Sequence, residues 1–190
     1  FYRAVCLTEK GIEEAKLINK IFEILKIRVS YVVSSPSCRA RETAIFAFKR
    51  IDQIEPSILH RTAQINDQHI PMGKKLRSVI EAIPIKPNEN IIISGHGGTL
   101  SIDYSNNVGI VDVNEVSDMD NRKETGIIVI EKKGNKFIAR HKFYSIYHLI
   151  NNILVLPVKD QSGDKFIFKD SIYDPENIKS GFIYHPNDTG

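Results

Sequence analysis

Cysteine is scarce in this chain of 190 residues, which contains only Cys6 and Cys38. The two form no CxxC pair and belong to no cluster with metal-ligand spacing, so the sequence predicts no metal site. Two cysteines in a chain of this length also predict no disulfide framework. We therefore expect two thiols, a reducing compartment and a cytoplasmic location.

Long apolar runs and blocks of one charge are missing as well. No apolar stretch reaches the ~18 residues that a membrane span needs, and the longest candidate, residues 147–158, is interrupted by polar residues and Pro157. The formal net charge is +3, and no block of lysine and arginine exceeds a few residues. The sequence therefore predicts neither a membrane nor a nucleic acid as a partner, while a locally positive pocket for an anion is compatible with it.

The chain also lacks internal repeats, low-complexity segments and a basic-then-apolar leader, and it begins with Phe1 rather than methionine. Its length, with 42% hydrophobic and 26% charged residues, fits one domain with a core. We expect a domain over residues 1–143 that lacks part of its start, and an extension over residues 144–190. Short apolar pieces between turn residues predict that the extension forms β-hairpins and loops packed on or following the domain.

Helix and strand patterns alternate along the domain, which predicts an α/β fold. Apolar residues at three- and four-residue steps predict an amphipathic helix over residues 8–26, with Thr8 as its N-cap and Gly11 as a point of close packing. A β-branched run over residues 29–35 predicts a buried strand.

The later segments continue this pattern. Residues 53–74 are a long polar excursion, and residues 76–83 are expected to form a short helix before a strand at residues 90–94. Apolar residues at 126–131 and 136–143, separated by a glycine-containing turn, predict a hairpin.

The most informative stretch is residues 91–99, with the sequence IIISGHGGT. Three consecutive isoleucines predict a strand buried on both faces, and His96 follows at its carboxyl end between glycines. Ligands of open α/β sheets bind at this edge, where an imidazole can donate protons or hydrogen bonds to an anion. The alternative interpretation is a strand that ends in a glycine turn with an incidental histidine.

Arg39 is the second candidate and lies in the segment SPSCRARETA. Pro36 or Ser37 begins a helix there, which places Arg39 in a first turn whose free N–H groups and dipole favour an anion. The strand–turn–helix order brings Arg39 to the same kind of sheet edge as His96. The alternative is a surface arginine that pairs with Glu42 or another carboxylate.

Three segments together resemble the histidine phosphatase superfamily, which has the phosphoglycerate mutase-like fold. They are LTEKGIEEA at residues 7–15, SPSCRARETA at residues 35–44 and GHGGT at residues 95–99. The resemblance covers roughly residues 7–143 and implies a three-layer α/β domain whose mostly parallel sheet is flanked by helices. It implies a phosphatase of phosphate monoesters or phosphohistidine in which Arg39 and His96 bind the phosphoryl group and take part in catalysis. It implies no metal and no other cofactor.

The sequence departs from that family at the nucleophile. The family's nucleophilic histidine belongs to an Arg-His-Gly motif on the first strand, whereas here Arg3 is followed by Ala4 and no histidine precedes His60. Since Arg39 and His96 are present, we expect that the first strand is missing from the chain as given. The chain should then turn over little or no p-nitrophenyl phosphate but still bind phosphate or vanadate.

An acid is also needed to protonate the leaving oxygen. The resemblance places it either in the loop after the second helix, where Asp67 is the nearest carboxylate, or after the histidine strand, where Glu124 precedes the predicted hairpin. We favour Glu124. A solvated surface carboxylate is the alternative for both.

Two further functions stay open at this point. One is a phosphotransferase of the mutase type, although no substrate signature for it is visible. The other is a non-catalytic regulatory domain that binds phosphate. In each case the partner is a phosphorylated small molecule or a phosphoprotein, and the sequence predicts no oligomeric state.

Overall fold

The computed structural model describes residues 6–58, 69–96, 110–114, 124–153, 158–159 and 165–166. Their elements, in chain order, are α1 (Glu9–Ile24), β1 (Val29–Ser34), α2 (Cys38–Phe48), β2 (Gln53–Ile54), η1 (Pro56–Ile58), α3 (His69–Ala82), β3 (Asn90–Ser94), β4 (Val113–Asn114), β5 (Ile127–Lys133), β6 (Lys136–Phe143), α4 (Ile146–Ile153), β7 (Val158–Lys159) and β8 (Lys165–Phe166). This is a mixed α/β arrangement with a small parallel sheet and helices. None of the described helices combines the length and apolarity that crossing a bilayer requires.

Helix α1 begins and ends close to its predicted bounds. The Thr8 hydroxyl accepts a hydrogen bond from the backbone N–H of Gly11 at 3.2 Å, so Thr8 is the N-cap as expected. A Cβ atom at Gly11 would lie only 3.1 Å from the Leu7 side chain, which confirms that the glycine permits close packing. The chain before α1 can therefore fold back against the first turn of this helix.

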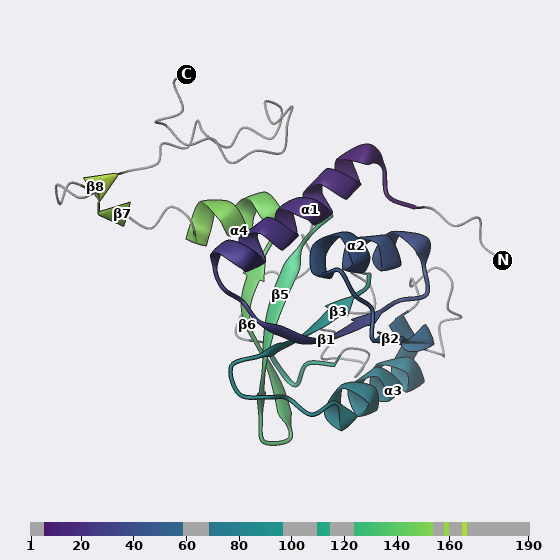
Figure 1. The fold of residues 1–190 in the computed structure, drawn as a ribbon. Coiled ribbons are helices and arrows are strands. Elements are labelled where there is room, and N and C mark those ends of the chain that lie inside the picture. The colour runs from purple at the N-terminus through teal and green to yellow at the C-terminus, as the bar shows by residue number, and fades with distance from the viewer. Residues whose placement is uncertain are drawn as a thin grey trace.

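A three-stranded parallel sheet in the order β2-β1-β3 forms beneath α2. Ser34 pairs with both Ser94 and Ile54, so all three strands end in one row at one edge. Figure 1 shows α1 and α2 on one side of this sheet and α3 on the other. The prediction of β3 is confirmed in its bounds and parallel direction.

The burial expected for β3 is wrong. Its three isoleucines were expected to be buried on both faces, but all three are only half-buried. The reason is its position: among the described strands, β3 pairs with β1 alone and leaves its other edge without a strand.

The second sheet contains the predicted hairpin. Strands β5 and β6 pair antiparallel, and Gly134, with φ of 59°, lies in the turn that joins them. Strand β4 adds to the other edge of β6 in parallel. Side chains from β1 and β3 share one apolar core with side chains from β5, β6 and α3, so the two sheets pack together.

The prediction of β-hairpins after residue 144 is wrong for its first part, which is the helix α4. Ile146, Leu149 and Ile150 lie three and four residues apart and are buried against Leu17 and Ile21 of α1 in a second core. The isoleucine-rich composition suggested a strand, but the spacing of the apolar residues places one helical face on α1. The short strands β7 and β8 do pair antiparallel. Helix α3 also differs, since it begins at His69, inside the segment expected to be a polar excursion.

Asp112 connects α3 to the second sheet. Its carboxylate accepts hydrogen bonds from Arg77 Nη1 at 2.7 Å and from the backbone N–H of Phe137 at 2.7 Å. Burial raises the pKa of Asp112, but these hydrogen bonds outweigh burial and leave the pKa below its ordinary value. Folding therefore favours the charged carboxylate. The stabilisation that Asp112 contributes is fully present above its pKa in the unfolded chain, and it is lost as the pH falls through its pKa in the folded protein.

We expect Asp112→Asn to lower the free energy of unfolding by about 1–2 kcal/mol at about pH 7, because the charged hydrogen bonds are lost. The difference should shrink as the pH falls below the ordinary pKa of an aspartate and through the lowered pKa of the native carboxylate. Urea unfolding at about pH 7 and at a pH below the folded pKa measures it. Glu81→Gln is the matched control, because Glu81 pairs with the same Arg77 but is 39% exposed and should change stability by less than about 0.5 kcal/mol. Equal losses at both pH values would contradict the linkage.

Candidate functional site

Two segments that lie far apart in the sequence meet at the carboxyl edge of the parallel sheet. The backbone N–H of Ser35 donates to the carbonyl of Ser94 at 2.8 Å, which continues the β1–β3 pairing one residue past the end of β1. The Ser94 hydroxyl donates to the carbonyl of Ala40 at 2.8 Å and fixes the start of α2 over β3. His96 and the first turn of α2 are thereby held next to each other.

His96 is 7% exposed, and side chains of the β1–α2 connection and α2 contact its ring. Its Nε2 lies 3.0 Å from the Ser37 hydroxyl and 3.2 Å from the Ser35 hydroxyl. Its Nδ1 lies 3.4 Å from Nη2 of Arg39. Because a guanidinium can only donate, this contact assigns Nδ1 as the acceptor and places the proton of a neutral imidazole on Nε2. In that tautomer Nε2–H donates toward the serine hydroxyls.

The N-terminus of α2 lacks the hydrogen bond that a serine cap normally supplies. Ser37 occupies the N-cap position, but its side chain makes no capping hydrogen bond and instead contacts His96. The N–H groups of the first turn carry the positive end of the helix dipole. Together with the Arg39 guanidinium and Nε2–H of His96, they form a concentration of donors suited to an oxyanion.

The structure brings Arg39 and His96 together, as the sequence predicted, and does not bring the favoured acid to them. Glu124 is exposed in the turn before β5 and interacts electrostatically with Glu14 of α1. Within the described residues, no contact joins Glu124 to Arg39 or His96. The alternative acid, Asp67, lies outside the described residues, as do residues 97–99 of the histidine turn.

Two groups at this edge were missed by the sequence analysis. The hydroxyls of Ser35 and Ser37 both reach His96, and their position on either side of Pro36 directly after a predicted strand could have indicated this. Glu55 follows β2 at the same edge and is 4% exposed. Its carboxylate accepts the backbone N–H of Ser57 at 3.0 Å, so it fixes the loop after β2.

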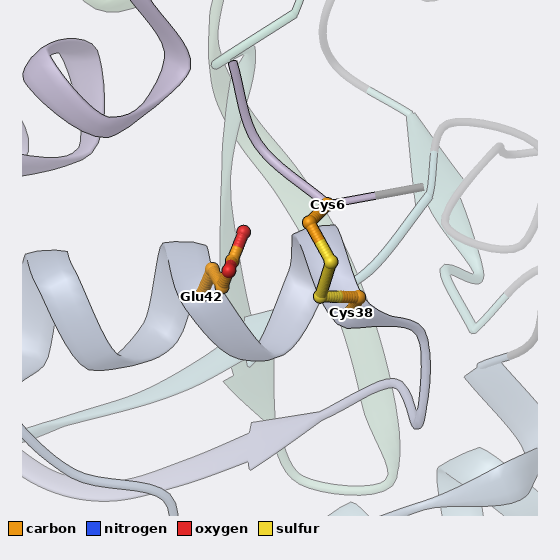
Figure 2. Close-up of side chains that lie close together, drawn as sticks. All are labelled: Cys6, Cys38 and Glu42. Atoms are coloured by element: carbon orange, nitrogen blue, oxygen red, sulfur yellow. A yellow bond between two sulfur atoms is a disulfide. The ribbon is translucent and has the colours of Figure 1, made fainter. Parts of the chain in front are cut away.

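The expectation of two thiols is wrong, because Cys6 and Cys38 form a disulfide with Cα atoms 4.8 Å apart. Figure 2 shows this bond at the start of α2, with Glu42 one turn further along the same helix. The two sulfurs and a Glu42 carboxylate oxygen lie within 4.8 Å of one another. While the sulfurs are bonded to each other they cannot act as thiolate ligands, so this group is not a metal site in this state. The cytoplasmic location, which rested on thiols in a reducing compartment, loses that support.

Comparison with known proteins adds no relative. No protein-family model matches the chain, and no curated protein is significantly similar to it. The resemblance to the histidine phosphatase superfamily therefore rests on the three motifs and on the proximity of Arg39 and His96.

Proposed function

We propose that the chain binds the phosphoryl group of a phosphate monoester or phosphohistidine between Arg39 and His96. We further propose that this site belongs to a phosphohydrolase of the histidine phosphatase type with a three-layer, phosphoglycerate mutase-like domain. The observation that carries the proposal is the 3.4 Å approach of the Arg39 guanidinium to the imidazole of His96 at the uncapped start of α2.

The chemistry of the site fits a doubly charged phosphate. A guanidinium presents two parallel N–H groups that match two phosphate oxygens, which a lysine cannot do. Nε2–H of His96 becomes available to the anion when the ligand replaces the serine hydroxyls. Donors that are already in place need little reorganisation as negative charge develops on the phosphoryl oxygens in a transition state.

Hydrolysis needs a nucleophile in addition to this oxyanion site. In the family that the sequence resembles, the nucleophile is the histidine of an Arg-His-Gly motif, which forms a phosphohistidine that water then hydrolyses. No Arg-His-Gly motif occurs in these 190 residues. The second candidate function is a phosphate-binding regulatory domain without catalysis, which keeps the anion site of Arg39 and His96 and has no nucleophile. For these 190 residues we expect anion binding with little or no turnover.

Calorimetric titration with inorganic phosphate and vanadate tests the proposal. We expect both anions to bind, and we expect His96→Gln to weaken phosphate binding about tenfold because a charge-assisted hydrogen bond is lost. His141→Gln is the matched control, because His141 is exposed on β6. The phosphate affinity of this variant should equal that of the native protein. Hydrolysis of p-nitrophenyl phosphate by the 190-residue chain should be close to the rate without protein. Equal phosphate affinity of the His96 variant and the native protein would contradict the site.

A further inference from the structure

We propose that the disulfide between Cys6 and Cys38 is a redox-sensitive clamp on the oxyanion site, so that the oxidised protein binds phosphate more tightly than the reduced protein. The inference rests on the proposed function, because it concerns the regulation of the same site.

The position of Cys38 carries the inference. Cys38 is the first residue of α2 and lies between Ser37 and Arg39, whose side chains contact opposite nitrogens of His96 alongside the Ser35 hydroxyl. A covalent bond at Cys38 therefore restrains the backbone from which both contacts start. The terminal turns of a helix fray more readily than its interior, and the N–H groups of the first turn have no partner within the helix.

A second tether reinforces the disulfide from the same segment. The backbone N–H of Leu7 donates to the Glu42 carboxylate at 2.6 Å, one turn along α2 from Cys38. Cys6 and Leu7 are thus attached to the first two turns of α2, and the next residue, Thr8, is the N-cap of α1. The segment therefore connects the start of α1 to the start of α2. Figure 2 shows the disulfide and the Glu42 side chain on the same side of α2. With the disulfide broken, this segment is held to α2 by the Glu42 hydrogen bond and by packing.

Reduction by a dithiol is a balanced two-electron step. A thiolate of the dithiol attacks the sulfur of Cys6, which belongs to an exposed residue, and the S–S bond breaks. The sulfur of Cys38 leaves as a thiolate at the helix N-terminus, where negative charge is favoured, and takes up a proton. The second thiol of the reagent then displaces Cys6 from the mixed disulfide, so the protein gains two electrons and two protons while the dithiol becomes a disulfide.

Phosphate binding and disulfide formation are then linked in both directions. If oxidation orders the first turn of α2, phosphate no longer has to order it on binding, and affinity rises by about five- to tenfold. By the same linkage, saturating phosphate lowers the midpoint potential of the disulfide, by about 30 mV for a tenfold difference in affinity.

The test compares phosphate affinity by calorimetry for the oxidised protein and for protein held in dithiothreitol, with circular dichroism confirming that both are folded. The reduced protein should bind about five- to tenfold more weakly, and amide hydrogen exchange should accelerate in residues 38–41 but not in α3. The double variant Cys6→Ser/Cys38→Ser should bind phosphate with the affinity of the reduced protein, and dithiothreitol should not change that affinity.

A pair of Glu42 variants keeps the test decisive if reduction unfolds the chain. Glu42→Ala in the oxidised protein removes both the acceptor and a negative charge, whereas Glu42→Gln removes only the charge. Loss of a negative charge alone strengthens anion binding, so about twofold weaker binding by Glu42→Ala, with no weakening by Glu42→Gln, isolates the tether.

Three results overturn the inference, and they differ in what they say about the proposed function. Equal affinities of oxidised and reduced protein, with binding lost in Arg39→Ala, remove the clamp and leave the oxyanion site intact. Absence of phosphate binding in either redox state removes both. For a chain that unfolds on reduction, unchanged affinity of the Glu42→Ala variant removes the clamp.

Discussion

Replacing Arg39 with alanine is expected to weaken phosphate binding at least about thirtyfold. Hydrogen bonds to charged groups contribute about 1.5–3 kcal/mol each, and about 2 kcal/mol corresponds to a thirtyfold change in affinity. The guanidinium places a positive charge directly against His96. Its removal leaves the first turn of α2 and Nε2–H of His96 to hold the anion.

Arg41 provides a matched control for this substitution. It lies two residues further along α2 and carries the same charge, but its side chain is exposed. Arg41→Ala should change phosphate affinity by less than about twofold, as expected for a screened surface charge. Arg39→Lys should fall between the two, because it keeps the charge and loses the two-pronged geometry. Similar losses in Arg39→Ala and Arg41→Ala would indicate a diffuse electrostatic effect and contradict a defined site.

Removal of the disulfide is expected to lower the free energy of unfolding by about 3–4 kcal/mol. The bond joins residues that are 32 positions apart, and a loop of that size loses this much conformational entropy in the unfolded chain. The loss is a large part of the stability of an ordinary domain. The variant Cys6→Ser/Cys38→Ser should therefore show a marked decrease in the urea midpoint.

Urea unfolding with and without dithiothreitol measures this effect and supplies its own control. The reductant should destabilise the native protein by the amount seen in the double variant and leave the double variant unchanged. A loss below about 1 kcal/mol would contradict this prediction, because the cross-link would then raise the free energies of the folded and unfolded states by nearly equal amounts. The disulfide would in that case not stabilise the fold by ordering the segment around Cys6.

Features governed by neighbouring residues could be predicted from the sequence. The Thr8 cap, the start of a helix near Pro36 or Ser37 and the Gly134 hairpin all follow from local chemistry and agree with the structure, in which α2 begins at Cys38. Arg39 and His96 could be predicted as a pair because each follows a β-branched strand, and parallel strands deliver their carboxyl ends to one edge.

Features governed by tertiary contacts could not be predicted. Nothing near Cys6 in the sequence indicates that it will meet Cys38, because their proximity depends on how α1 packs on α2. The same holds for Glu14, which is buried in α1 and hydrogen-bonds to Tyr147 of α4. Burial raises the pKa of Glu14 more than Lys10 and this hydrogen bond lower it. Pro36 and Ser37 were both predicted as possible helix starts, but the contact of the Ser37 hydroxyl with His96 in place of its own helix depends on tertiary structure.

The Ser37 hydroxyl contacts His96 and does not cap α2, and this has a consequence for the ligand. Helix α2 is left without its own terminal acceptor, and a bound phosphate oxygen can take that role by accepting the unused amide hydrogens of the opening turn. The substrate would thus complete a secondary-structure element of the protein, and saturation with the anion would raise the melting temperature by mass action.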